Sequence, residues 1–374
     1  MRPGGSWMEK RIALLAALLL AVSVARAQPE GYQVELLHPI PLITSIVWAP
    51  DGRMFFTEKS GGVRVVSADG QLRQTPVVQL NVRQENEDGL QSIALDPDFA
   101  ENGYFYVYYT PVPEADGEAF NVITRFTERD GAGVSPVDLF RYRNESPLHQ
   151  HHGGRLVFGP DGYLYFSVGD LSHWNVKAQD PNQVEGKIHR VAVVDGELLP
   201  PDDNPFPDST TWAYGLRNVF SFTFDPYSGG LFATENGPDC DDFLLRVQPG
   251  DNFGWGLVEM SGDDKTYCDN PDRRAGAAPP LMSFTPTVAL AGIDVYDGEV
   301  FPDWQGDLLA CEYKSSQLVR FVLDAERTTL ADGPLVVDTG ANMGCAVEVA
   351  VGPDGLIYYT NLIGMYRIAP AETP

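Results

Sequence analysis

Residues 158–167 read Phe158-Gly-Pro-Asp-Gly-Tyr-Leu-Tyr-Phe-Ser167, the clearest copy of a motif that recurs along the chain. The proline presets φ, and the aspartate and glycine accept turn geometry. Apolar and aromatic residues on both sides of the turn favour strands. The motif therefore predicts a β-hairpin with a Pro-Asp turn at its tip.

Five degenerate copies of this motif lie before and after it, and successive motif prolines are 47 to 76 residues apart. That interval is close to the roughly 50 residues of a long propeller blade. We therefore expect an all-β fold, a six-bladed β-propeller of four-stranded antiparallel blades. The six motif prolines are Pro50, Pro97, Pro160, Pro226, Pro302 and Pro353.

Several predicted strands are continuously apolar, for example residues 104–109 and 164–168. Such strands suit blades that are covered on both faces by their neighbours. A two-sheet sandwich is the competing fold, but its turns recur every 8 to 12 residues or so, without the longer period seen here.

The N-terminal segment has the pattern of a secretory signal peptide. Lys10 and Arg11 follow Met8, the run 12–24 is apolar, and Ala25-Arg26-Ala27 is a small-x-small cleavage pattern. We expect residues 1–27 to be removed as a signal peptide, with translation starting at Met8. Residues 28–374 should then form one propeller domain that is periplasmic or secreted. The alternative, a membrane anchor, is disfavoured because the apolar run is shorter than the roughly 20 residues that span a bilayer.

The formal net charge of −26 limits the partners of the chain. It disfavours nucleic acid and anionic membrane surfaces, and it favours neutral or cationic ligands and metal cations. The alternative is that the acidity serves solubility alone.

Four cysteines, an even number in an exported chain, suggest two disulfides with three possible pairings. We favour Cys240 with Cys268 and Cys311 with Cys345, because these residues are neighbours in sequence.

Polar residues beside the repeat strands are the candidates for chemistry, because loops at one end of a propeller converge. His149, His151 and His152 precede the third hairpin and Asp170 follows it. A histidine oriented by a carboxylate is a candidate general base, and a merely solvated histidine run is the alternative. Further candidates are Arg217-Asn218, the acidic loop 235–242 with oxygen ligands suited to calcium, and Lys314.

The motifs taken in order resemble those of the glucose/sorbosone dehydrogenase family, which oxidises aldose sugars with pyrroloquinoline quinone and calcium. The resemblance covers nearly the whole mature chain. It rests on the first and second repeats and on five further motifs: His151-His-Gly-Gly-Arg-Leu-Val-Phe-Gly-Pro-Asp-Gly, Gly186-Lys-Ile-His-Arg, Asp203-Asn-Pro-Phe, Gly215-Leu-Arg-Asn and Gly250-Asp-Asn-Phe-Gly-Trp.

The resemblance implies a reaction in which His151 removes the proton from the anomeric hydroxyl while C1 passes hydride to the quinone. The product is a lactone, and an external electron acceptor completes the cycle. The implied catalytic residues are His151, Asp170 and Arg217; the implied cofactor contacts are Arg217, Asn218, Lys314, Thr287 and Glu87; the implied calcium ligands are Gly237, Pro238 and Asp242.

The chain departs from the family at the cofactor. The family has two arginines that grip the quinone carboxylates where this chain has Cys345 and Val347, and a glutamine, a tryptophan and a glutamate where it has Phe220, Thr285 and Phe243. Two other functions therefore stay open beside the sugar dehydrogenase. One is a non-enzymatic extracellular binding propeller that has lost the cofactor, as in hedgehog-interacting proteins, and the other is a metal-dependent hydrolase of the lactonase type.

Overall fold

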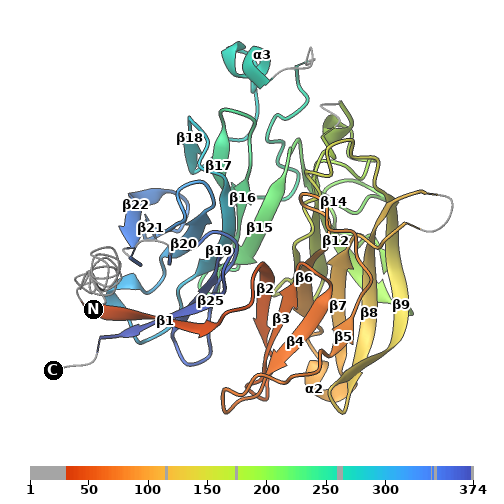
Figure 1. Cartoon of the computed structure of the whole chain (residues 1–374). Coiled ribbons are helices and arrows are strands. Elements are labelled where there is room, and N and C mark those ends of the chain that lie inside the picture. The colour runs from red at the N-terminus through yellow and green to blue at the C-terminus, as the bar shows by residue number, and fades with distance from the viewer. Residues whose placement is uncertain are drawn as a thin grey trace, which may run out of the picture.

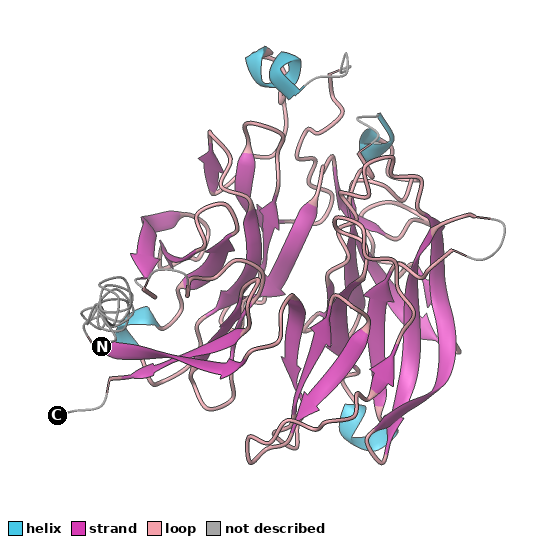
Figure 2. Ribbon diagram, viewed as in Figure 1, coloured by secondary structure: helices cyan, strands magenta, loops and turns pink. Residues whose placement is uncertain are grey.

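The computed structural model describes residues 31–113, 117–172, 176–258, 264–337, 339–340 and 343–371. The predicted signal peptide at residues 1–27 lies outside these ranges. Strands dominate the described chain, and its helices are short (Figure 2). No helix in this part of the chain has the length and apolar character needed to cross a membrane.

The strands of the described ranges form six antiparallel sheets, which follow one another along the chain as the blades of a propeller (Figure 1). This confirms the predicted fold. Blades 1 to 3 contain β2 (Ile43–Trp48), β3 (Met54–Glu58), β4 (Gly62–Val66) and β5 (Val78–Gln79); β6 (Leu90–Leu95), β7 (Tyr104–Tyr109), β8 (Phe120–Arg129) and β9 (Ala132–Arg143); and β10 (Leu156–Phe158), β11 (Leu164–Val168), β12 (Lys187–Val194), β13 (Glu197–Leu199) and β14 (Thr211–Tyr214). Blades 4 to 6 contain β15 (Val219–Phe224), β16 (Leu231–Glu235), β17 (Asp242–Val247) and β18 (Met282–Phe284); β19 (Leu290–Val295), β20 (Leu308–Glu312), β21 (Gln317–Leu323) and β22 (Leu330–Val337); and β23 (Val349–Val351), β24 (Ile357–Thr360), β25 (Met365–Pro370) and β1 (Tyr32–His38).

Blade 3 is the one sheet of the described chain with a fifth strand. Its third strand, β12, pairs with β13 through Ala192–Val194 and with β14 through Lys187–His189. The two short strands thus pair with different halves of the same edge of β12, so the blade is still four strands wide.

Each Pro-Asp motif connects the first and second strands of a blade. Pro50 and Pro160 lie in tight turns of this kind, whereas α2 (Phe99–Asn102) and the 3-10 helix η2 (Pro302–Trp304) extend the turns of blades 2 and 5. All these turns lie at one end of the ring. The loops that enter the first strands and leave the second strands therefore lie at the other end.

The core lies between the blades rather than at a single centre. Among the described residues, one large apolar cluster fills each of the six interfaces between neighbouring blades. Phe55 of blade 1 and Phe105 of blade 2, for example, belong to one such cluster and are fully buried. Burial of each such side chain contributes about 1.5–3 kcal/mol, so the interfaces stabilise the ring.

The ring closes by pairing the two ends of the described chain. Strand β1 lies antiparallel to β25, with Tyr32 opposite Pro370 and His38 opposite Met365. Both termini consequently leave from the same blade (Figure 1). The sequence did not predict this, because β1 carries no Pro-Asp motif.

The favoured disulfide pairing is confirmed. Cys240 pairs with Cys268 and Cys311 with Cys345. The first pair ties α3 (Asp264–Asp269) to the loop after β16, at the end of the molecule opposite α2 (Figure 1). The second pair links the end of β20 to the loop that enters β23, and so joins blades 5 and 6.

Candidate active site

All the predicted site residues lie at the end of the ring where the first strands begin and the second strands end. They precede β6, β10, β15 and β19 or follow β11, β16 and β20. The propeller thus brings residues of blades 2 to 5 together although they are up to 227 positions apart in sequence. The residues so placed are Glu87, His151, Asp170, Arg217, Asn218, Gly237, Pro238, Asp242, Thr287 and Lys314.

His151 and Asp170 form a buried pair. His151 Nδ1 lies 2.6 Å from Asp170 Oδ1, and Asp170 is fully buried. Trp255 Nε1 donates to the other carboxylate oxygen at 2.8 Å, and the Ser172 backbone N–H donates to Oδ1 at 2.8 Å. Burial alone would raise the pKa of Asp170, but the hydrogen bond and charge interaction with His151 outweigh it and lower the pKa. The carboxylate therefore stays ionised and orients the imidazole.

The backbone of His151 has φ of 61°, in the left-handed region that residues with a Cβ seldom adopt. Glu87 holds this loop, since Glu87 Oε2 accepts the N–H of His151 at 2.8 Å and of His152 at 3.4 Å. The same oxygen accepts Asn218 Nδ2 at 3.3 Å. Two residues predicted as cofactor contacts, Glu87 and Asn218, thus also fix the base.

Arg217 connects the histidine pair with the loop after β16. Its backbone carbonyl accepts the N–H of Asp170 at 2.7 Å. Its Nη1 donates to the carbonyl oxygens of Asn236 and Gly237, each at 2.9 Å. The positive charge of Arg217 is therefore held between the dyad and the predicted calcium ligands.

Lys314 and Thr287 lie on the other side of the same loop. Lys314 Nζ donates to Thr287 Oγ1, and Thr287 Oγ1 donates to the Pro238 carbonyl at 3.4 Å. Two cations, Arg217 and Lys314, thus flank the carbonyls of Gly237 and Pro238.

Asp242, predicted as a metal ligand, has both carboxylate oxygens engaged by backbone groups. Oδ1 accepts the Gly237 N–H at 2.8 Å, and Oδ2 accepts the Ala289 N–H at 2.6 Å. Its observed contacts therefore hold the loop of Gly237 and Pro238 against the entrance of β19. Within the described ranges, no three His, Cys, Asp or Glu residues gather as a metal cluster would.

The quinone and calcium implied by the family resemblance fit this donor set. An anionic quinone needs cations and amide donors, which Arg217, Lys314 and Asn218 supply. A hard cation needs oxygen ligands, and the carbonyls of Gly237 and Pro238 are of this kind; in this structure they accept from Arg217 Nη1 and Thr287 Oγ1.

Cys345 and Val347 occupy the positions where the family resemblance implies two arginines. Cys345 is fully buried in its disulfide with Cys311, and Val347 is buried beside it. Phe220 packs against the apolar cluster that contains Cys311 and Cys345.

An ion pair crosses the middle of the ring, between the opposite blades 3 and 6. Arg155 Nη1 lies 2.5 Å from Glu348 Oε2. Burial raises the pKa of Glu348 to about 7, although the positive charge of Arg155 acts in the opposite direction.

Two residues at the site were not singled out from the sequence. Trp255 binds Asp170, and its position at the end of the Gly250–Trp255 motif was the available signal. Glu235, noted only as part of an acidic loop, accepts the backbone N–H groups of Arg217 and Asn218. Burial raises the pKa of Glu235 to about 8, against the hydrogen bonds and positive charge of Arg217. A buried neutral carboxyl cannot be recognised from sequence alone.

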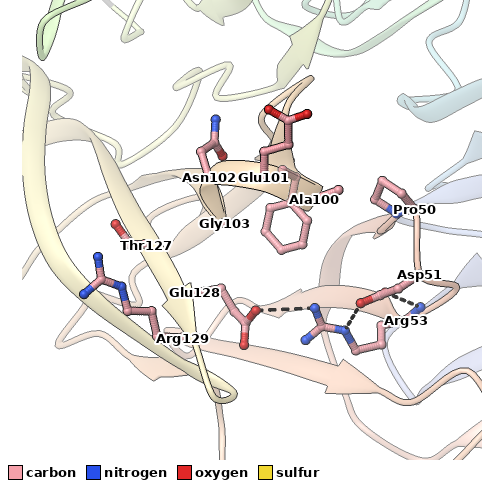
Figure 3. A pocket seen from close by; sticks show the side chains of 11 residues that line it. Pro50, Asp51, Arg53, Ala100, Glu101, Asn102, Gly103, Thr127, Glu128 and Arg129 are labelled. Atoms are coloured by element: carbon pink, nitrogen blue, oxygen red, sulfur yellow. Dashed lines mark hydrogen bonds and ion pairs between the residues drawn. The ribbon is translucent and has the colours of Figure 1, made fainter.

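A pocket at the opposite end of the ring contains none of the predicted site residues (Figure 3). It lies between the turns of blades 1 and 2. Arg53 at its edge pairs with Asp51 at 2.7 Å and Glu128 at 3.3 Å. The pocket holds no histidine and none of the predicted site residues, so the chemistry is assigned to the other end.

Comparisons with known proteins show the family and the fold of the chain. A family model described as Glucose / Sorbosone dehydrogenase matches residues 38–362. An aldose sugar dehydrogenase of Escherichia coli is 28% identical, over 94% of this chain and 95% of that protein. Quinoprotein glucose dehydrogenase B of Acinetobacter calcoaceticus is 30% identical, over 69% of this chain and 62% of that protein. The crystal structure of the soluble E. coli aldose sugar dehydrogenase in its apo-form superposes with a TM-score of 0.78 at 26% identity, covering 91% of this chain and all of that one.

Proposed function

Because this chain belongs to the glucose/sorbosone dehydrogenase family, we propose that it is an exported oxidoreductase that oxidises aldose sugars at C1 to lactones. The observation that carries the proposal is the buried His151–Asp170 pair beside Arg217 and Asn218. The names of its relatives, an aldose sugar dehydrogenase and a quinoprotein glucose dehydrogenase, support the same chemistry. The two disulfides support export, because such bonds persist in oxidising compartments.

His151 acts as the general base in this proposal. Asp170 accepts the Nδ1 proton of His151, which leaves Nε2 to take the proton of the anomeric hydroxyl. As that proton arrives, the ionised Asp170 stabilises the imidazolium, and Trp255 and Ser172 keep the carboxylate in place.

Arg217, Lys314, Asn218 and Thr287 would hold pyrroloquinoline quinone, and the carbonyls of Gly237 and Pro238 would hold calcium. The bound quinone supplies the acceptor for the two electrons and the hydrogen that leave sugar C1. Arg217 keeps a positive charge next to the dyad, and Lys314 keeps a second one at the far side of the loop. An external acceptor then removes the electrons from the protein.

The two alternative functions gain no specific support. The lactonase alternative needs several acidic and amide ligands converging on a channel ion, and no group of three His, Cys, Asp or Glu residues in the described ranges is arranged to hold a metal ion. The binding-module alternative gives no role to the oriented pair of His151 and Asp170.

The test is a titration of the purified chain with the quinone, with and without calcium, followed by dye reduction with aldoses. We expect saturable absorbance changes that need calcium, and sugar-dependent turnover that falls by about 10³-fold in His151→Gln. Lys314→Met should weaken quinone binding by about tenfold while leaving the dyad intact. No spectral change at micromolar quinone would reject the proposal, as would full activity of His151→Gln.

A further inference from the structure

The loop that carries the base is held in an unfavourable backbone conformation at two places. His149 has φ of 54° and His151 has φ of 61°. Residues with a Cβ avoid this region, so surrounding contacts must hold the loop there. The Glu87 carboxylate provides some of these contacts through the backbone N–H groups of His151 and His152.

The residue after Glu87, Asp88, provides further contacts. Asp88 is fully buried, and its carboxylate lies 3.0 Å from His149 Nδ1, 3.0 Å from His152 Nε2 and 2.5 Å from Arg83 Nε. Burial alone would raise the pKa of Asp88, but the hydrogen bonds from His152 and Arg83 lower it to about 2. Two adjacent carboxylates therefore hold the loop. Glu87 binds backbone N–H groups of the loop, and Asp88 contacts its histidine side chains.

Hydrogen bonds around His152 define the role of its Nδ1 atom. His152 is fully buried, and its Nδ1 faces the side-chain amides of Asn121 and Asn144 at 3.4 and 3.3 Å. Asn144 Oδ1 accepts the Ser146 N–H, and Asn121 Oδ1 accepts Thr110 Oγ1. Both amides must then turn their N–H₂ groups toward His152, so Nδ1 is an acceptor.

With Nδ1 as an acceptor, the ring proton of His152 lies on Nε2, which is 3.0 Å from Asp88 Oδ1. His151 has the opposite tautomer, because its Nδ1 donates to Asp170. Two adjacent histidines thus have different tasks. His151 is paired with Asp170 as the proposed base, and His152 is buried against Asp88.

We propose that Asp88 and His152 are positioning residues, which hold the His151 loop so that Nε2 of His151 faces the substrate. This role rests on the proposed function, but the geometry of the anchor can be tested without turnover. Asp88 and His152 lie outside the set of residues proposed to contact substrate or cofactor, and they act through Glu87 and the backbone of the loop.

The decisive variants are His152→Gln and His152→Phe. A glutamine can donate to Asp88 and accept from the two asparagines, as the imidazole of His152 does in this arrangement. A phenylalanine has similar bulk and leaves all three groups without their partner. His189→Gln is the matched control, because His189 is a second buried histidine of blade 3 that bonds Val184 and Thr210 outside the site.

The readout that does not depend on activity is the side-chain NMR spectrum of ¹⁵N-labelled histidines, of which the chain has six. At pH 7 we expect His152 with a protonated Nε2 and His151 with a protonated Nδ1. The His151 signals should shift or broaden in His152→Phe and stay in place in His152→Gln and His189→Gln. Unchanged His151 signals in a folded His152→Phe would overturn the proposal.

The kinetic readout is the separation of kcat from KM. We expect kcat to fall about 30-fold in His152→Phe with KM within about threefold of the wild type, because a displaced base costs rate rather than binding. His152→Gln should restore kcat to within about threefold. Equal losses in both variants would overturn the hydrogen-bond argument.

Asp88→Asn provides the same comparison if His152→Phe does not fold, since the amide keeps the shape of the carboxylate and removes its charge. It should displace the His151 signals in the same direction. If no variant and no wild-type preparation oxidises sugar, the proposed function fails, while the NMR comparison still decides whether the anchor exists.

Discussion

The two sides of the site end are built differently. The dyad side, formed by Glu87, His151, Asp170, Asn218 and Trp255, consists of buried and half-buried polar groups joined by hydrogen bonds. The disulfide side, formed by Cys311, Cys345 and Val347, is a neutral apolar wall with a covalent link. The comparison teaches that a catalytic base is oriented by a network of hydrogen bonds, whereas the shape of the apolar side is maintained by side-chain packing and the disulfide. Damage to the two sides should therefore appear in different measurements.

The largest expected effect is on the dyad side. In Asp170→Asn the amide can donate to His151 Nδ1, which favours the tautomer with its proton on Nε2 and removes the negative charge behind the imidazole. We expect kcat to fall about 10³-fold with little change in the unfolding midpoint. Steady-state kinetics and thermal unfolding measure the two effects, with the exposed Asp51→Asn at the far end of the ring as control. A loss of less than tenfold would contradict the assigned role of Asp170.

The next effect should appear on the disulfide side, and in stability rather than rate. Replacement of Cys311 and Cys345 together by alanine opens a loop of 34 residues, which costs about 4 kcal/mol of unfolding free energy in the chain-entropy view. The matched control is the Cys240/Cys268 double alanine variant, whose loop of 28 residues should cost nearly as much.

Chemical denaturation of both variants measures this difference. The Cys311/Cys345 variant should lose more, because both sulfurs are fully buried and their removal leaves a cavity in the core between blades 5 and 6. Equal stability of this variant and the wild type would show that packing alone maintains the wall.

The smallest effect concerns the ion pair that joins the two sides. The pKa of Glu348 is raised from its usual 4.5 to about 7 by burial, so protonation favours the folded state. Its contribution is complete below pH 4.5 and is lost as the pH rises to 7, by up to about 3 kcal/mol. We expect Glu348→Gln to flatten the fall in unfolding free energy between pH 5 and 8, with the exposed Glu101→Gln as control. Parallel pH profiles for Glu348→Gln and the wild type would contradict this.

The sequence predicted the features that depend on local pattern. Each Pro-Asp turn is a short-range signal, and six of them were enough to count the blades. The closing strand β1 was not predicted, because its partner residues 365–370 are 327 to 338 positions away and no local motif marks it. The fifth strand of blade 3 was missed for a similar reason, since β13 and β14 are three and four residues long.

The candidate site follows the same division. His151 and Asp170 flank one hairpin, so their contact could be expected from the motif. Glu87, which accepts the backbone N–H of His151, and Trp255, which donates to Asp170, come from other blades. Only the closed ring brings them to the pair. The division of the histidine run was also hidden, because whether a side chain faces Asp88 or Asp170 depends on the left-handed backbone at His149 and His151. The protonation of a buried acid such as Glu235 depends on burial, which the sequence does not state.

The pairing of β1 with β25 also determines how the molecule responds to mechanical load. Tyr32 and Pro370 are opposite each other at the end of the ladder from which both termini leave. A force that pulls the termini apart therefore loads the interstrand hydrogen bonds one after another, as in opening a zip, rather than all together in shear. The closure should yield at low force, and β1 should detach before any other strand. Because β1 is the outermost strand of blade 6 and β23 the innermost, the first rupture would occur at the rim and leave the Arg155–Glu348 pair at the centre joined.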